Sequence, residues 1–398
     1  MPARQSHIHH ALPYVFAVIL AIAAGPADAA TNTRTAAASL TATPATLTAA
    51  LAALQPGQTL VLEGRFSETL IRDRDFGGVT IDARRAEFAG GLLLRNVQNI
   101  SFVGGTYGSR IAPMRGNNTV EILNGAHISF AHATIVGDND GKGVGVMVRQ
   151  SRNVTVRDTV LEGHRAGLTS ISSTDSLFTR NQFLNLSSDG INLSDSHRIL
   201  ATHNLCQGFT PSAGAHPDCI QLWSLKDKPL QSDIYLLNNT AYGATQGFAS
   251  FDPSTASGIR FTFAGNYMET SYPQGVACYG CFDSRFLNNT LIATPGARWR
   301  TSMNIVGGAG NEIAGNLLYD WRTGAPAWAS SLQRQFSDLV PSIAGVGSIH
   351  DDRSYGASIT GDSIAAVPEP ATWAQMIIGM MLIGIVRRGR QSMILQAS

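Results

Sequence analysis

The chain has 398 residues, of which 14% are charged, and its formal net charge is +1 at pH 7. This near-neutral balance excludes a nucleic-acid-binding protein and a disordered acidic chain. Between the two terminal segments lie about 340 residues, enough for one large domain or two ordinary ones.

The first 29 residues have the layout of a secretory signal peptide. A basic start that includes Arg4 precedes the apolar run ALPYVFAVILAIAAG, and Ala27-Asp28-Ala29 supplies a cleavage site of small residues. We therefore expect export through the Sec machinery, a mature chain that starts near Ala30, and a linker over residues 30–44. A buried N-terminal helix is the alternative, but it would leave the basic start and the A-x-A end unexplained.

A short helix is expected next, followed by the first strand. Leu47, Leu51 and Leu54 lie at helical spacing, and Gln55-Pro56-Gly57 ends the helix before TLVL. Because a stack of strands exposes unpaired backbone groups at its open ends, we expect this helix to cap one end of the fold.

A pattern then recurs along the chain: an apolar residue, two free positions, a small or amide residue, one free position and another apolar residue. Short alternating strands at a period near 25, with no helical pattern between them, predict a parallel β-solenoid. A β-sandwich is the competing fold, but it would favour hairpin turns and would not repeat so regularly. The asparagines of successive coils are expected to form an amide ladder. The central positions, 22 to 35 residues apart, are Gly105, Ala133, Thr159, Asn181, Asn204, Asn239, Asn266, Asn289 and Asn316.

With this cap and these coils, residues 45–320 resemble the right-handed parallel β-helix of the pectin-lyase-like superfamily. The resemblance implies an all-β, single-stranded solenoid of about nine to eleven coils, and we expect a monomer. Residues 321–366 lack the repeat and are expected to form a covering segment followed by a linker.

Polar residues recur in the strands that precede the amide positions. Alternation directs Asn192, Gln221 and Trp223 outward, whereas Asp189 and Asp218 fall at the mouths of adjacent strands, about 5 Å apart. Two carboxylates this close repel each other, which raises at least one pKa and prepares an acid beside a base. The aligned segments AGLTSIS, DGINLSD, DCIQLWS, QGFASFD and QGVACYG begin at Ala166, Asp189, Asp218, Gln246 and Gln274.

Long connections flank the strand that begins at Asp218. The connection from Asn204 to Asp218 takes 14 residues, where comparable connections from an amide position to the next aligned strand take 7 or 8. The connection from Asp218 to Asn239 takes 21 residues, against 15 from Asp189 to Asn204. Functional residues concentrate on such loops, and these contain His216, Lys226 and Lys228. The alternative hypothesis is that the two aspartates are turn residues that bond to backbone amides.

The segments SSDGINLSDS and HPDCIQLWS resemble two neighbouring strands of polygalacturonase-type glycoside hydrolases, N-T-D-G-I-D and D-D-C-I-A. The match places Asp189 at the Asp of N-T-D and Asp218 at the second Asp of D-D. Ser187 replaces the Asn, Pro217 replaces the first Asp, Gln246 stands at the His of G-H-G, and no R-I-K follows. The H-P-D-x-I-Q form is more similar to β-helix proteins of exopolysaccharide-producing bacteria, which implies a lyase or epimerase of polyuronates.

Three functions remain open. The first is a lyase or epimerase of an acidic polysaccharide, in which His216 or Lys226 removes the proton beside the uronate carboxylate. The second is a glycoside hydrolase that uses the two aspartates, and the third is a non-catalytic scaffold that binds exopolysaccharide. Asp189 and Asp218 are also candidate ligands for Ca²⁺. The residues assigned to catalysis are Asp189, His216, Asp218 and Lys226, and those assigned to substrate binding are Asn192, Gln221, Trp223, Lys228 and Gln246.

Four cysteines in an exported chain indicate disulfides, and four cysteines allow three pairings. A bridge between Cys206 and Cys219 would staple the loop that holds His216, and Cys278 with Cys281 is a short-loop candidate. Zinc binding through CYGC is the alternative, although the chain has a single C-x-x-C motif.

The C-terminal stretch VPEPATWAQMIIGMMLIGIVRRGR joins Pro368-Glu369-Pro370, an apolar run and an arginine cluster. It resembles the PEP-CTERM sorting signal of Gram-negative bacteria that make exopolysaccharide. The resemblance implies a short membrane helix within residues 367–390, processing by an exosortase, and delivery to the cell surface or extracellular matrix. An ordinary C-terminal membrane anchor is the alternative.

Overall fold

The structure, a computed structural model, describes residues 39–109, 118–212, 215–224, 228–250, 257–320 and 325–327. The predicted signal peptide and sorting signal lie outside these residues, as do Lys226 and most of the segment 321–366. No helix in the described part of the chain is long and apolar enough to cross a membrane.

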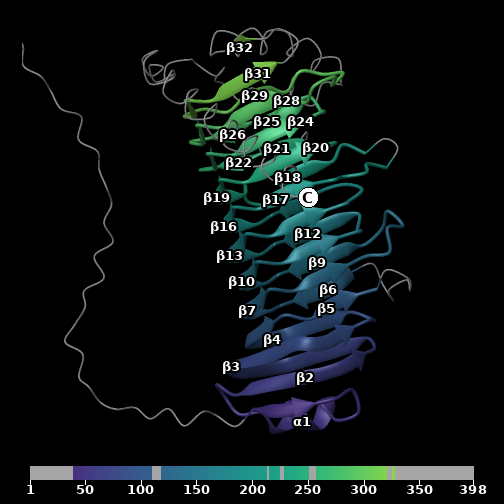
Figure 1. Ribbon diagram of the computed structural model, residues 1–398. Coiled ribbons are helices and arrows are strands. Elements are labelled where there is room, and N and C mark those ends of the chain that lie inside the picture. The colour runs from purple at the N-terminus through teal and green to yellow at the C-terminus, as the bar shows by residue number, and fades with distance from the viewer. Residues whose placement is uncertain are drawn as a thin grey trace, which may run out of the picture. The chain divides into compact units, whose positions relative to one another are not determined.

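Parallel strands make up most of the described residues and stack in columns (Figure 1), three of which follow from the strand pairing. Most of the buried apolar side chains form one cluster. Neighbouring strands of a column pair in parallel, which confirms the predicted all-β parallel solenoid. The first column contains β6 (Asn118–Leu123), β9 (Val144–Arg149), β12 (Ala166–Ile171), β15 (Ile191–Ser194), β18 (Asp218–Trp223), β21 (Gln246–Ser250), β25 (Gln274–Tyr279) and β29 (Ser302–Val306). The second contains β7 (Ala126–Ala131), β10 (Arg152–Arg157), β13 (Thr174–Thr179), β16 (His197–Thr202), β19 (Ser232–Leu237), β22 (Gly258–Ile259), β23 (Thr262–Ala264), β26 (Cys281–Phe282), β27 (Arg285–Leu287) and β30 (Glu312–Ala314). The third contains β5 (Thr106–Gly108), β8 (Thr134–Val136), β11 (Val160–Glu162), β14 (Gln182–Leu184), β17 (Leu205–Gln207), β20 (Thr240–Gly243), β24 (Tyr267–Thr270), β28 (Thr290–Ala293) and β31 (Leu317–Asp320).

The two ends of the stack depart from this pattern. At the start, α1 (Leu47–Ala53) occupies the position of the expected cap, and Arg74 Nη2 donates to the carbonyl oxygen of Leu54, just beyond the helix, at 2.7 Å. Three longer strands follow. The repeat did not predict them because its first match begins at Phe102, near the end of the third strand. They are β2 (Thr59–Phe66), β3 (Thr69–Phe88) and β4 (Leu92–Val103), and β1 (Leu40–Ala42) pairs with β2. At the other end, β32 (Ala325–Ala327) pairs with β31 in the antiparallel direction.

The core is built from inward side chains that lie in register from coil to coil. Ile191 pairs with Ile220 and Leu193 pairs with Leu222, and all four side chains are fully buried. Because one coil alone cannot enclose such side chains, their burial depends on the stacking of neighbouring coils.

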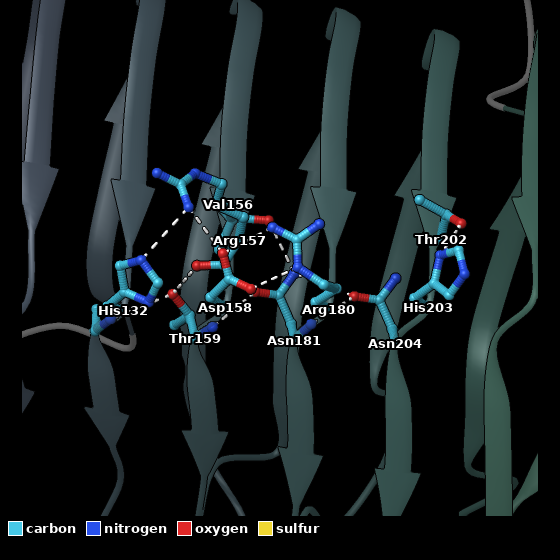
Figure 2. A network of polar contacts seen from close by, with 11 residues as sticks. His132, Val156, Arg157, Asp158, Thr159, Arg180, Asn181, Thr202, His203 and Asn204 are labelled. Carbon is cyan, nitrogen blue, oxygen red and sulfur yellow. Dashed lines mark hydrogen bonds and ion pairs between the residues drawn. The ribbon is translucent and has the colours of Figure 1, made fainter.

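The amide ladder lies between the second and third columns (Figure 2). Asn204 Oδ1 accepts from both the backbone N–H and the Nδ2 of Asn181, at 3.0 and 3.1 Å. Asn204 Nδ2 in turn donates to Asn239 Oδ1 at 2.9 Å, and the same bonds continue to Asn316. The ladder therefore supplies partners for amide groups that would otherwise be buried and unpaired, as predicted.

A row of residues with left-handed backbone conformation precedes the ladder, one residue earlier in each coil. His132, Asp158, Arg180 and His203 have φ values of 57°, 52°, 54° and 56°. Figure 2 shows Arg157 and Arg180 beside Asp158. Their nitrogen atoms lie 2.6 to 2.8 Å from the Asp158 carboxylate oxygens. The hydrogen bonds from Arg180 are the main cause that lowers the pKa of Asp158 to about 2.

Candidate functional site

The strand β18 breaks its alternation once, next to Asp218. The two residues that follow, Cys219 and Ile220, are both buried in the core. Because two successive side chains point inward, Asp218 and Gln221 lie on the same outward side of the strand although they are three residues apart. Two adjacent coils of the first column thus present two polar residues each on one side, Asp189 with Asn192 and Asp218 with Gln221.

Asp189 holds the equivalent place one coil earlier and is buried, with 4% of its surface exposed. Its Oδ1 accepts hydrogen bonds from the Asp218 backbone N–H and the Ser188 hydroxyl, each at 3.2 Å. Its Oδ2 accepts from Asn192 Nδ2 at 3.1 Å. Burial raises the pKa of Asp189, and these bonds and the charge of Arg165 act in the opposite direction. Asp189 therefore bonds to a backbone amide, as the turn-residue hypothesis expects.

Asp218 is fully buried, and neither of its carboxylate oxygens accepts a hydrogen bond from any described residue. His216 Nδ1 lies 3.5 Å from its Oδ2, which is the distance of an ion pair rather than of a short hydrogen bond. Burial raises the pKa of Asp218 to about 7; the His216 contact opposes this rise, and the charge of Asp189 adds to it. Unlike Asp189, Asp218 does not behave as a turn residue bonded to amides.

The imidazole of His216 is the exposed partner of this pair, with 64% of its side-chain surface accessible. The contact with Asp218 raises the pKa of His216, burial lowers it, and the charges of Asp218 and Asp189 raise it further. The pair therefore presents a titratable imidazole to solvent, backed by a carboxyl group that solvent does not reach.

Asn192, Gln221 and Trp223 form a chain of hydrogen bonds beside this pair. Asn192 Nδ2 donates to Gln221 Oε1 at 2.9 Å, and Trp223 Nε1 donates to Asn192 Oδ1 at 3.0 Å. Gln221 Nε2 donates to no described residue, and 44% of the Trp223 surface is exposed. An amide donor and an indole ring are therefore available to a ligand on this side of the strand.

The remaining predicted site residues lie apart from these contacts. Gln246 pairs in register with Asp218 and is buried, and its Oε1 has no partner in the described part of the chain. Lys228 is exposed and contacts none of the other described site residues, and Lys226 lies outside the described residues. The structure brings together Asp189, Asn192, His216, Asp218, Gln221 and Trp223.

The sequence analysis missed Ser188 and Arg165, which both act on Asp189. The Ser188 backbone N–H donates to the Arg165 carbonyl oxygen of the previous coil at 2.8 Å. Aligning the coils one residue further towards the N-terminus would have placed both residues beside the site.

Two disulfides are present, and both are the predicted pairs. Cys206 bridges to Cys219 with 5.5 Å between their Cα atoms, which fixes the loop that carries His216 to the core. Cys278 bridges to Cys281, so the CYGC motif offers no free thiol to zinc.

The described residues contain no group of three or more His, Cys, Asp or Glu side chains that could hold a metal ion. Asp189 also presents both oxygens to hydrogen-bond donors rather than to a cation. The pair of aspartates therefore does not match the six to eight oxygen ligands that Ca²⁺ takes.

Comparison with known proteins found one family model and several solved structures that are similar to this chain. A family model described as periplasmic copper-binding protein (NosD) matches residues 95–218, and no curated protein matches the chain. Among solved structures, the mannuronan C-5 epimerase AlgE6 A-module of Azotobacter vinelandii is similar at 14% identity and a TM-score of 0.49, over 69% of this chain and 84% of that one. An alginate lyase from Paenibacillus is similar at 15% identity and a TM-score of 0.46, over 69% and 98%. PfbA, a surface adhesin of Streptococcus pneumoniae, is similar at 10% identity and a TM-score of 0.46, over 67% and 80%.

Proposed function

We propose that the protein is an exported lyase or epimerase of a uronate-containing polysaccharide, with His216 as the general base. The observation that carries this proposal is the contact between an exposed imidazole and a buried carboxyl group, His216 Nδ1 and Asp218 Oδ2. A carboxyl group in this place orients the imidazole and stabilises its protonated form. The two disulfides fit the oxidising compartment that export implies.

In this reaction, the imidazole of His216 takes the proton from the carbon that bears the uronate carboxylate. In a lyase, the electron pair of that C–H bond forms a double bond to the neighbouring carbon as its bond to the glycosidic oxygen breaks, and the leaving oxygen takes up a proton. In an epimerase, a proton returns to the opposite face of the same carbon. Neither reaction needs an oxidant or a reductant.

The uronate carboxylate needs donors, and the site must not repel it. Gln221 Nε2 is an available donor, and Lys228 adds an exposed positive charge in the flanking loop. The pKa of Asp218 at about 7 leaves this group partly protonated at neutral pH, and burial also raises the pKa of Asp189. The protonated fraction of Asp218 reduces the negative charge that an acidic substrate meets.

The hydrolase alternative is less well supported. It needs two carboxyl groups that face the scissile bond, whereas Asp218 is fully buried and Asp189 is 4% exposed. Both oxygens of Asp189 also accept hydrogen bonds within the fold. The non-catalytic scaffold remains an outcome of the test.

His216→Gln tests the proposal because glutamine retains a polar side chain of similar length but cannot take the proton. With a panel of polyuronates, we expect the activity to fall by about a hundredfold or more while the melting temperature changes little, since the imidazole is mostly exposed. Lyase action is measured as ultraviolet absorbance of the new double bond, epimerase action as a changed sugar composition by NMR, and hydrolysis as reducing ends without that absorbance.

Because the contact with Asp218 raises the pKa of His216, the activity should rise with pH and reach half of its maximum above the ordinary pKa of 6.5. Lys228→Gln is the control, and it should weaken substrate binding without removing turnover. Full activity of His216→Gln would contradict the proposed base, and polymer binding without any of the three products would support the scaffold.

A further inference from the structure

A second group of polar and aromatic side chains lies on the outward side of the third column. In β20 the buried Ala241 precedes Tyr242, which is 36% exposed. In β24 the buried Met268 separates Tyr267 from Glu269, and both of these are partly exposed. Alternation therefore places Tyr242, Tyr267 and Glu269 on one surface of two adjacent coils.

These three side chains contact one another. The rings of Tyr242 and Tyr267 have centroids 5.7 Å apart and planes inclined by 54°. The Tyr267 hydroxyl donates to Glu269 Oε2 at 3.2 Å, and Tyr242 pairs in register with Glu269. Burial and the neighbouring charge of Glu269 raise the pKa of Tyr267 to about 12, so its hydroxyl keeps the proton that it donates.

We propose that Tyr242, Tyr267 and Glu269, here called the tyrosine platform, bind a neutral sugar ring of a polysaccharide. A pyranose has a C–H face that packs on aromatic rings and a rim of hydroxyl groups that donate to a carboxylate. Glu269 offers a second oxygen for such a donor. Its negative charge also repels a uronate, so the platform discriminates between the two kinds of sugar.

The tyrosine platform is connected to the candidate site through one turn. The Thr245 hydroxyl and the Gln246 backbone N–H both donate to the Pro217 carbonyl oxygen, at 3.2 and 2.6 Å. Pro217 lies between His216 and Asp218, and Gln246 follows Tyr242 by four residues. The inference rests on the proposed function, because it describes the substrate of that same enzyme. The substrate is inferred to be a heteropolysaccharide that carries a neutral sugar beside the uronate.

Binding rather than turnover tests the inference, so that its failure is distinguishable from failure of the proposed function. The parent is His216→Gln, which prevents degradation of the polymer if His216 is the base. Two probes are used in isothermal titration: gellan, which contains both neutral sugars and glucuronate, and polymannuronate, which contains uronate alone. Tyr242→Ala and Tyr267→Ala are compared with Tyr235→Ala, a tyrosine of the second column that is 42% exposed.

We expect Tyr242→Ala and Tyr267→Ala each to weaken gellan binding roughly tenfold, the equivalent of about 1.4 kcal/mol, and Tyr235→Ala to leave it unchanged. Glu269→Gln should strengthen polymannuronate binding because it removes the negative charge. Tyr267→Phe retains the ring and should bind gellan better than Tyr267→Ala does. Three outcomes would overturn the inference, whatever activity the His216 variants show. They are equal gellan binding by the parent and both alanine variants, an equal loss of binding in Tyr235→Ala, and no gellan binding by the parent.

Discussion

The two buried aspartates of neighbouring coils differ because their hydrogen-bond partners differ. Asp189 accepts three hydrogen bonds, whereas Asp218 accepts none from the described residues. A buried carboxylate without donors is destabilised relative to its protonated form. We therefore expect Asp218 to lower the stability of the fold at neutral pH, as groups at functional sites often do.

Asp218→Asn tests this statement through the pH dependence of stability. The pKa of Asp218 is raised from 3.8 to about 7 on folding, so the folded protein binds the extra proton. The stability that this proton contributes is present below pH 4 and is lost as the pH rises to 7, by up to about 4 kcal/mol at 1.36 kcal/mol per pKa unit. Urea unfolding should show that the variant loses less stability between pH 4 and 8 and exceeds the wild type at pH 8.

Asp158→Asn is the matched control because the pKa of Asp158 is lowered to about 2. Its stabilising contribution is present above pH 3.8 and is lost as the pH falls, which is the opposite sign. The side chain of Asp158 is partly exposed, with 20% of its surface accessible, so solvent screening should limit the loss at neutral pH to about 1 kcal/mol. If both variants respond to pH in the same direction, the environment assigned to Asp218 is wrong.

At the scale of the element, the amide ladder stabilises the corner between the second and third columns. Asn239 is fully buried and bonds to Asn204, to Asn266 and to the carbonyl oxygen of Ala201. Each rung therefore supplies partners to groups of the coil before it and the coil after it.

Asn239→Ala should reduce the free energy of unfolding by about 3 kcal/mol or more, because it leaves at least two buried groups unpaired at about 1–3 kcal/mol each. Asn316→Ala is the control, since Asn316 is the last rung and is partly exposed. It should lose clearly less stability in the same urea titration. Equal losses at both positions would mean that the ladder does not act through its buried bonds.

The regular elements were predictable from sequence, and the site was predictable in part. Asparagine recurs at the same template position in six successive coils, so the stacking of coils and the ladder followed from the residues alone although the spacing varies from 23 to 35 residues. The separate environments of Asp189 and Asp218 did not follow, because they depend on a bend after Asp218 that buries both Cys219 and Ile220. The alternation of inward and outward side chains along a strand does not predict two successive inward residues.

At the scale of the whole molecule, several ion pairs on the surface connect one coil with the next. Asp175 pairs with Arg198 and Asp233 pairs with Arg260, in each case with a residue of the next coil. Such bonds form in one register of the stack, so they add specificity to a core of similar apolar coils. Exposed pairs of this kind contribute little to stability individually.

The antiparallel strand β32 affects how readily the protein self-associates. The last coil of a parallel stack has unpaired backbone N–H and C=O groups, and these groups can pair with a strand of another chain. Because β32 pairs with β31 in the antiparallel direction, we expect it to block the addition of another parallel strand at this end. A protein truncated after Asp320 should therefore form multimers with increasing concentration in light scattering, whereas truncation after Ala327 should not. Two equally monomeric truncations would assign this blocking role to another part of the chain.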